Sequence, residues 1–161
     1  LASCFPNIVI ADISYPIISN GVNMINAHIT CLRKLASMSA SWKYVLMLQN
    51  HDFPLRTNLE LIEVLKMHNG ANDVELLKAN PLRFKIRWKL VFGPDGFPVD
   101  FEQSNESKPN PPHNFTIYKG SVSAALSRPF IDFVLKNRHI DDFVSYLNES
   151  LFGDELFWYM T

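Results

Sequence analysis

The stretch Ser41-Trp-Lys-Tyr-Val-Leu-Met-Leu-Gln-Asn-His-Asp-Phe-Pro-Leu-Arg-Thr-Asn58 decides the fold class of this chain. Residues 42–48 are rich in β-branched and aromatic side chains, which is typical of a strand. A polar loop follows, and Thr57 and Glu60 then stand three positions apart ahead of an apolar run, the spacing of a helix capping box. The stretch therefore predicts a strand, a loop and a helix that ends at Asn69-Gly70.

The same alternation of strands and helices extends outward on both sides of this unit. It favours an α/β fold with a mixed, mainly parallel sheet flanked by helices. Residues 93–113, rich in proline and polar side chains, predict a long surface loop. The other predicted elements are strands at 7–11, 85–92 and 122–126 and helices at 22–36, 130–135, 140–147 and from 154 onward.

Composition limits the classes of protein to which the chain can belong. Hydrophobic residues make up 47% and charged residues 19% of the 161 residues, which indicates one packed domain over residues 1–161. The 15 basic and 16 acidic residues nearly cancel, so no strong field favours a nucleic acid or an anionic membrane surface. No apolar run reaches the roughly 18 residues that a transmembrane helix needs.

The two cysteines, Cys4 and Cys31, form neither a disulfide framework nor a zinc motif. They are either two buried thiols or two members of disulfides. Three N-glycosylation sequons, at Asn105, Asn114 and Asn148, favour a secreted or lumenal protein. Disulfides are expected in that compartment, so the sequons favour paired cysteines.

Motifs for metal, phosphate and serine chemistry are absent from the sequence. It has no glycine-rich phosphate loop, no HExxH, no serine elbow and no Asp-x-Asp pair. The five histidines show no ligand spacing, and we expect no metal site. Two constellations that could carry chemistry remain. His51-Asp52 either ends a strand at a ligand-binding edge or closes a turn, and Asp154-Glu155 is either a helix cap with a first-turn acid or a site that holds a general base.

The decisive stretch closely resembles the signature of the core-2/I-branching glycosyltransferases, glycosyltransferase family 14. Further matches follow in the same order and cover nearly the whole chain. They are Gly70-x-Asn72, Glu75, Arg87-Trp88, Lys119-Gly-Ser121, Leu126-Ser-Arg128 and Asp154-Glu-x-x-Trp158, with Ala2-Ser-Cys4-Phe and the helix that bears Cys31 upstream.

This resemblance implies a GT-A-like fold and an inverting transfer of N-acetylglucosamine from UDP-N-acetylglucosamine (UDP-GlcNAc) to the 6-hydroxyl of an acceptor sugar in O-glycan branching. It implies no metal cofactor, which agrees with the missing Asp-x-Asp pair. It also implies a type II membrane glycoprotein of the Golgi with its catalytic domain in the lumen. The chain is then an internal piece of that enzyme, a single partial catalytic domain that we expect to be inactive alone.

Position by position, the resemblance assigns roles to individual residues. Glu155 matches the catalytic base, and Glu75 and Arg87 match residues that hold the acceptor sugar. An acceptor-binding lysine precedes that arginine in the family, and here Lys85 or Arg83 takes its place, with Lys85 preferred. Cys4 and Cys31 match cysteines whose disulfide partners lie outside this chain, so we expect no bond between the two.

Two other functions remain open at this stage. Peptide O-xylosyltransferases carry a related Asp-[Phe/Tyr]-Pro-x-x-Thr-Asn block, although Arg87-Trp88 and Asp154-Glu-x-x-Trp158 resemble the branching enzymes more. The other alternative is a non-catalytic, carbohydrate-binding relative. The presence of Glu155 argues against it, because a protein without catalysis has no need of that acid.

Overall fold

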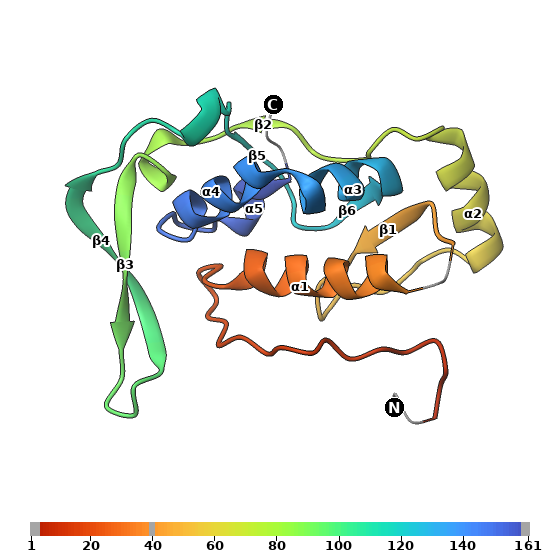
Figure 1. Cartoon of the computed structure of the whole chain (residues 1–161), viewed down its shortest axis with the longest axis horizontal. Helices are drawn as coiled ribbons and strands as arrows, with labels where there is room; N and C mark the ends of the chain where they lie inside the picture. Colours follow the sequence, from red (N-terminus) through yellow and green to blue (C-terminus); the bar gives the residue numbers. More distant parts are fainter. Residues whose placement is uncertain (1–3, 39–40, 159–161) are drawn as a thin grey trace.

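The computed structural model describes residues 4–38 and 41–158, which form helices and short strands around one core (Figure 1). No helix in these residues is both long enough and apolar enough to cross a membrane. The helices are α1 (Met24–Ser37), α2 (Asn58–Met67), α3 (Arg128–Lys136), α4 (Arg138–Leu147) and α5 (Asp154–Phe157), with 3₁₀ turns η1 (Pro81–Arg83) and η2 (Pro112–Asn114). The strands are β1 (Tyr44–Met47), β2 (Leu77–Lys78), β3 (Ile86–Phe92), β4 (Pro98–Ser107), β5 (Tyr118–Lys119) and β6 (Ala124–Ser127).

An apolar stripe on and just before α1 forms one side of the core, and this confirms its predicted helical spacing. Val22, Ile25, Ile29 and Leu32 are all buried. The stripe packs against α3 and α5, and α4 packs on α5 (Figure 1). Each such buried side chain contributes about 1.5–3 kcal/mol, so the core fixes α5 firmly against α1. The fully buried residues on the other side are Leu126, Ile131, Phe143, Leu156 and Phe157.

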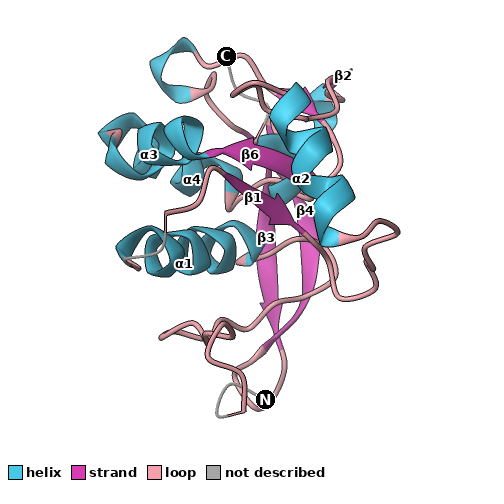
Figure 2. Ribbon diagram, turned by 90° about the vertical axis from the view of Figure 1, so that its right-hand side faces the viewer, coloured by secondary structure: helices cyan, strands magenta, loops and turns pink. Residues whose placement is uncertain are grey.

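In the described part of the chain the strands form three two-stranded ladders, and all three are antiparallel. β1 pairs with β6 and β3 with β4 (Figure 2), and β2 pairs with β5. The expected mainly parallel sheet is therefore wrong for these residues. Alternation along the sequence fixes the order of elements but not their partners: α2 follows β1, yet the next strand, β2, joins a different ladder.

The surface loop predicted at 93–113 is wrong for much of its length, because β4 occupies the middle of it and pairs with β3. The two strands form a long hairpin at one end of the molecule (Figure 1). Gly96 has a φ of +78°, which the tight turn between them requires. Along β4 the buried side chain is that of Phe101. The rest of the strand faces solvent, so its polar composition looks like that of a loop.

The buried strand predicted at 7–11 is also wrong. Within the described chain these residues join no ladder, and Ile10 is 73% exposed. The segment runs beside α1 (Figure 1), where Asp12 forms an ion pair with Lys34 at 2.9 Å. A β-branched run becomes a strand only when a neighbouring strand satisfies its backbone groups, and the described ladders do not supply one here.

The capping box predicted at the start of α2 is confirmed. Thr57 Oγ1 accepts the Glu60 amide at 3.3 Å, and the Glu60 carboxylate accepts the Thr57 amide at 2.9 Å. Unlike α1, this helix buries no residue. It lies at the opposite end of the molecule from the β3–β4 hairpin (Figure 1). Local capping therefore defines where α2 starts, and tertiary packing adds little to it.

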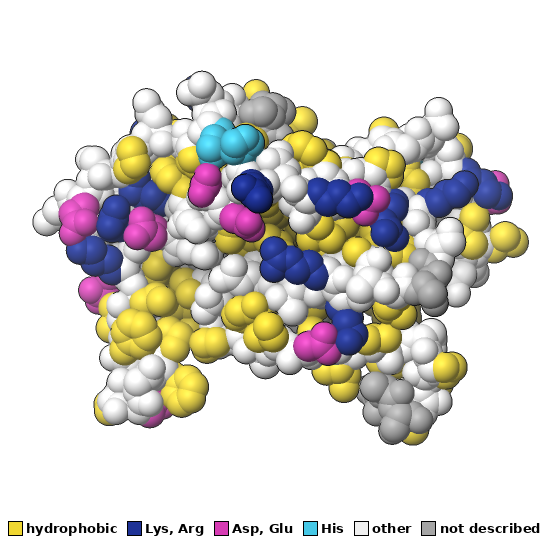
Figure 3. Space-filling model, viewed as in Figure 1, with side chains coloured by type: hydrophobic (Ala, Val, Ile, Leu, Met, Phe, Trp, Pro, Cys, Tyr) yellow, Lys and Arg dark blue, Asp and Glu magenta, His cyan; other side chains and the backbone are white. Residues whose placement is uncertain are grey.

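Charged side chains of both signs are interspersed on the face drawn in Figure 3. Ion pairs within one helix include an exposed one, Lys66 with Glu63 at 2.7 Å, and a half-buried one, Arg128 with Asp132 at 2.9 Å. The chain as a whole has a formal charge of −1. This face therefore carries no broad patch of a single sign, in agreement with the balance seen in the composition.

Candidate active site

Glu155 lies in the first turn of α5, on a segment whose backbone is held from two sides. Its amide donates to the Phe152 carbonyl at 3.1 Å, and its carbonyl accepts the Gly120 amide at 2.9 Å. The next two residues, Leu156 and Phe157, are fully buried and anchor the helix in the core. The Glu155 side chain is 31% exposed. The core thus holds the backbone while the carboxylate remains accessible to solvent.

Two glycines allow the chain to pack closely around this turn. A β-carbon at Gly153 would lie 2.6 Å from the Leu147 carbonyl oxygen. One at Gly21, whose φ is +86°, would lie 2.4 Å from Oδ1 of Asp154. Neither position has room for a side chain. These close contacts set α5 against the end of α4 and the start of α1.

Arg83 makes the shortest ion pair of Glu155, with Nη2 3.0 Å from Oε2. The same guanidinium donates to two backbone carbonyls, those of Leu151 at 3.2 Å and Phe152 at 3.1 Å. It also lies over the Phe152 ring, 5.2 Å from the centroid. The Arg83 side chain is only 12% exposed. Three hydrogen bonds and burial therefore fix the guanidinium, and the guanidinium in turn orients the carboxylate.

Lys119 of β5 supplies a second positive charge to the same oxygen, with its Nζ 3.7 Å from Oε2. The other carboxylate oxygen of Glu155, Oε1, accepts no hydrogen bond from any residue that the structure describes. A carboxylate held at one oxygen and open at the other can accept the proton of a bound hydroxyl group. This asymmetry is the chemically useful feature of the site.

Asp154, next to Glu155, is in a different environment. It is 6% exposed, and burial raises the pKa of its carboxyl to about 6. Its Oδ1 has no hydrogen-bond partner among the described residues. The N-cap of α5 is Gly153, so the interpretation of Asp154 as the helix cap is wrong. Of the two acids, only Glu155 is open to a ligand from solvent.

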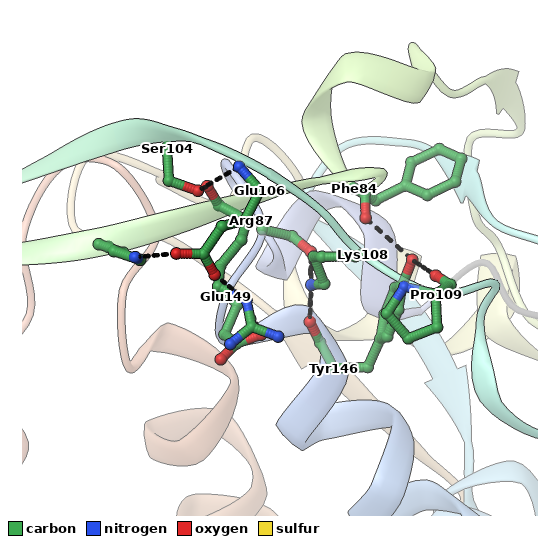
Figure 4. Close-up of polar contacts among 10 residues, drawn as sticks. Phe84, Arg87, Ser104, Glu106, Lys108, Pro109, Tyr146 and Glu149 are labelled. Carbon is green, nitrogen blue, oxygen red and sulfur yellow. Dashed lines mark hydrogen bonds and ion pairs between the residues drawn. The ribbon is translucent and has the colours of Figure 1, made fainter.

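Arg87, predicted to bind the acceptor, lies on β3 in a separate ionic cluster (Figure 4). Its Nε is 3.5 Å from a Glu149 oxygen and 3.6 Å from a Glu106 oxygen. Glu106 also pairs with Lys89 across the hairpin. All of these side chains are more than one-third exposed. The Arg87 cluster is therefore a solvated network, and among the described residues it forms no ion pair with Glu155.

Lys85 and Glu75, the other residues predicted to hold the acceptor, are both exposed. Among the described residues the Lys85 side chain makes no ion pair or hydrogen bond, so it is Arg83 and not Lys85 that contacts Glu155. Glu75 lines an open groove of about 390 Å³ beside the β1–β6 ladder. The acceptor-binding roles of Lys85, Glu75 and Arg87 stay predictions.

Asp52 closes a turn after β1, which favours the turn interpretation of this residue over the ligand interpretation. Its Oδ2 accepts the Gln49 amide at 2.9 Å and the Ser123 hydroxyl at 2.7 Å. The Gln49 amide, followed by the Ser123 hydroxyl, lowers the pKa of the Asp52 carboxyl. The contact with Ser123 also ties this turn to the groove that Glu75 lines.

Cys31 carries an exposed thiol on α1, so the interpretation of this residue as a buried thiol is wrong. In the described chain no disulfide joins it to Cys4, which is exposed too. The disulfides expected with cysteines outside the chain stay predictions.

The three sequons differ in accessibility. Asn105 on β4 and Asn114 in η2 are exposed, whereas Asn148, the C-cap of α4, is half-buried. The Ser150 hydroxyl of the third sequon is buried and accepts a hydrogen bond from Lys108. Glycosylation of Asn105 and Asn114 is therefore more compatible with the fold than glycosylation of Asn148.

Sequence reasoning overlooked Lys119 as a partner of Glu155 and placed Arg83 second to Lys85. The signal for Lys119 is its position in the Lys119-Gly-Ser121 match, which brings the Gly120 amide to the Glu155 carbonyl. The signal for Arg83 is its place at the end of η1, a turn opened by Pro81. Neither signal gives a distance to Glu155, because Arg83 and Glu155 stand 72 positions apart in the sequence.

Comparison with known proteins identifies the family of the chain. The profile of the Core-2/I-Branching enzyme family matches residues 1–160. Similar proteins include "Beta-1,3-galactosyl-O-glycosyl-glycoprotein beta-1,6-N-acetylglucosaminyltransferase 4" of zebrafish (Danio rerio), 34% identical over 98% of this chain and 38% of that protein. The mouse "N-acetyllactosaminide beta-1,6-N-acetylglucosaminyl-transferase" is 33% identical over 98% of this chain and 40% of that protein. The chain thus spans well under half the length of these relatives. It belongs to the Core-2/I-branching enzyme family.

Proposed function

We propose that the complete protein is an inverting glycosyltransferase with a GT-A-like fold. It transfers N-acetylglucosamine from UDP-GlcNAc to the 6-hydroxyl of an acceptor sugar in O-glycan branching. The names of the similar proteins from zebrafish and mouse, both β-1,6-N-acetylglucosaminyltransferases, support this activity. Membership of the family, over residues 1–160, supports the fold.

The observation that carries the proposal is the asymmetric environment of Glu155. One of its oxygens is held by Arg83 at 3.0 Å and approached by Lys119 at 3.7 Å, and the other is open. A sugar hydroxyl is a weak nucleophile until a base within hydrogen-bond reach takes its proton. Glu155 is placed to be that base, and Arg83 is the residue that positions it.

A single base accounts for an inverting transfer. The acceptor oxygen attacks the anomeric carbon as Glu155 takes the hydroxyl proton, and the bond from that carbon to UDP breaks. Retention through a glycosyl-enzyme needs a second, nucleophilic carboxylate about 5–5.5 Å away. The neighbouring acid, Asp154, is buried and cannot serve that role. The environment of the two acids therefore favours inversion.

Binding of the acceptor is assigned to Glu75, Arg87 and either Lys85 or Arg83. Charged side chains form strong hydrogen bonds with sugar hydroxyls. In Figure 4 the Arg87 guanidinium lies between Glu149 and Glu106. Because this cluster is exposed, a ligand can replace one of these carboxylates without a large loss of buried contacts.

We also propose that the complete protein resides in the Golgi membrane with this domain in the lumen. The exposed sequon asparagines Asn105 and Asn114 support exposure to the glycosylation machinery. The expected disulfides of Cys4 and Cys31 belong to the same compartment. Catalysis is proposed to need no metal cofactor, as the resemblance of residues 41–58 to the branching glycosyltransferases implies.

The test is an assay of the complete protein with UDP-GlcNAc and two acceptors, a β-1,3-galactosyl O-glycan and N-acetyllactosamine. We expect a β-1,6 linkage in the product, read by NMR. Glu155→Gln keeps the shape and removes the base, so turnover should fall by at least about 100-fold. Glu63→Gln, an exposed acid on α2, is the matched control and should remain near wild type.

Other outcomes distinguish the alternatives. Transfer of xylose to a serine-containing peptide would favour a peptide O-xylosyltransferase. Binding of glycans without any transfer, by wild type and Glu155→Gln alike, would favour a non-catalytic relative. Near-normal turnover in Glu155→Gln would remove this residue as the base even if the enzyme activity were present.

A further inference from the structure

Three side chains with metal-binding atoms converge at the surface where η2 meets α4. His113 Nε2 is 2.7 Å from Asp142 Oδ2 and 3.1 Å from His139 Nδ1. All three ligand atoms lie within 4.8 Å of one another. Figure 3 shows histidine side chains gathered on this face beside an acidic side chain. The three residues are exposed, so the site is open to solvent.

The fold, and not the sequence spacing, makes this cluster. His139 and Asp142 stand three positions apart on α4, which places them on the same face of the helix. Asn137, the N-cap, accepts the His139 amide at 3.0 Å and fixes the start of that helix. His113 comes from η2, where its φ of +54° puts it in the left-handed region. Its position therefore depends on a strained backbone that the packing of η2 against α4 maintains.

Hydrogen bonds alone satisfy the cluster poorly. His113 Nε2 carries at most one proton, yet it contacts both the Asp142 carboxylate and the His139 nitrogen. A bound cation would instead accept a lone pair from all three atoms. Two imidazoles and one carboxylate suit a transition metal such as Zn²⁺, and they disfavour Mg²⁺ and Ca²⁺, which take oxygen ligands.

Two of the three spacings between the ligand atoms are close to those of a zinc site. Ligand atoms about 2.0–2.1 Å from Zn²⁺ stand about 3.3 Å apart at tetrahedral angles. The distances of 2.7 and 3.1 Å from His113 Nε2 approach that value, and the His113 and His139 rings, whose centroids lie 3.8 Å apart, must turn away from one another so that both nitrogens face one ion. We propose that His113, His139 and Asp142 form a surface site for Zn²⁺, with a fourth position open to water.

The site is separate from the proposed catalytic chemistry. Its three residues make no hydrogen bond or ion pair with Glu155 in the described chain. Zinc would tie η2 to α4 and stabilise the layer beneath it, where His113 contacts Phe115, and Phe115 contacts Phe143 with ring centroids 4.9 Å apart. Its predicted role is therefore structural, and it is compatible with a transfer reaction that needs no metal.

Zinc binding is measured directly by equilibrium dialysis of the chain, with Cys4 and Cys31 replaced by serine so that thiols cannot bind the metal. We expect one Zn²⁺ per chain and a rise in Tm on addition of Zn²⁺ but not of Mg²⁺. His113→Ala, His139→Ala and Asp142→Asn should each weaken binding by at least about tenfold. His51→Ala, an exposed histidine outside the cluster, should bind as wild type does.

Asp142 is exposed, so Asp142→Asn should remain folded, and circular dichroism checks this for each variant. X-ray absorption of the zinc-loaded protein should show two imidazole ligands and no sulfur. The proposal is overturned if the parent protein binds no zinc, if the three variants bind it as tightly as the parent, or if His51→Ala alone abolishes binding.

Discussion

Two arginines four positions apart end in very different surroundings. Arg83 is 12% exposed, donates three hydrogen bonds and holds Glu155 at 3.0 Å. Arg87 is 38% exposed and approaches two carboxylates at 3.5 and 3.6 Å. Both arginines form ion pairs with glutamates. Burial and geometry, and not residue type, distinguish the pair that holds the Glu155 carboxylate from the pair that lies in solvent.

The difference has an energetic reason. An exposed ion pair contributes about 0–1 kcal/mol, because water and salt screen it and side-chain entropy opposes it. A buried pair adds little net stability, but removing one partner leaves the other charge without compensation. The Arg83 pair is therefore rigid and sensitive to mutation. The Arg87 cluster is adaptable, which suits a surface that exchanges its own carboxylates for a ligand.

The largest effect on stability should come from Arg83→Met, which keeps much of the side-chain stem and removes the charge. It leaves Glu155 and two carbonyl groups without their donor, so we expect a loss of about 3 kcal/mol in the free energy of unfolding. Arg87→Met should cost less than about 1 kcal/mol. Urea denaturation followed by circular dichroism measures both. Equal losses in the two variants would contradict the comparison.

A second effect of similar size concerns the pH dependence of stability that arises from Asp154, which is buried, and His28, which is half-buried. Burial raises the pKa of Asp154 from 3.8 to about 6, so its contribution to stability is present below about pH 4 and is lost as pH rises towards 6. Burial lowers the pKa of His28 from 6.5 to about 4, so its contribution is present above pH 6.5 and is lost as pH falls towards 4. Each of these contributions to the free energy of unfolding is about 3 kcal/mol.

Between about pH 4 and 6, the contribution of Asp154 to stability falls with pH and that of His28 rises. The two changes cancel in the wild type, so variants of each residue alone should reveal them. His28→Leu should become less stable relative to wild type as pH rises across this window. Asp154→Asn should become more stable relative to wild type over the same window. Urea midpoints at pH 4, 5 and 6 measure both trends, and parallel curves for all three proteins would show that these groups do not titrate as burial requires.

A smaller effect is expected on acceptor binding in the complete enzyme. Arg87→Ala removes a proposed partner of the sugar hydroxyls, so the acceptor KM should rise by about tenfold, the equivalent of one charged hydrogen bond. The donor KM should stay within about twofold. Lys89→Ala, which removes the neighbouring partner of Glu106, is the matched control. A rise in the donor KM alone would show that Arg87 lies on the donor side.

No effect at all is expected from removal of metal ions during catalysis. If the proposed metal-independent transfer is right, excess EDTA should leave the turnover of the complete enzyme within experimental error. Any zinc lost from the surface site should lower Tm without lowering kcat. Activity that EDTA abolishes and manganese restores would contradict this expectation.

The β3–β4 hairpin shows where local sequence signals are insufficient. Its second strand is polar, buries Phe101 and begins at Pro98, so composition alone makes it resemble a loop. Residues 7–11 show the reverse case, with a strand-like composition and no ladder in the described chain. In both cases the outcome depends on whether another segment offers a pairing edge, which neighbouring residues in sequence do not encode.

The sequence by itself determined the family, the helices with clear apolar periodicity and the capping box at Thr57, and it singled out Glu155 as the candidate base. These features are local patterns or direct matches, so no tertiary contact is needed to recognise them. Only the tertiary structure decided that the ladders are antiparallel, that Arg83 rather than Lys85 holds Glu155, and that His113 meets Asp142. Each of these depends on contacts between segments far apart in the chain, and such contacts are set by how the core packs.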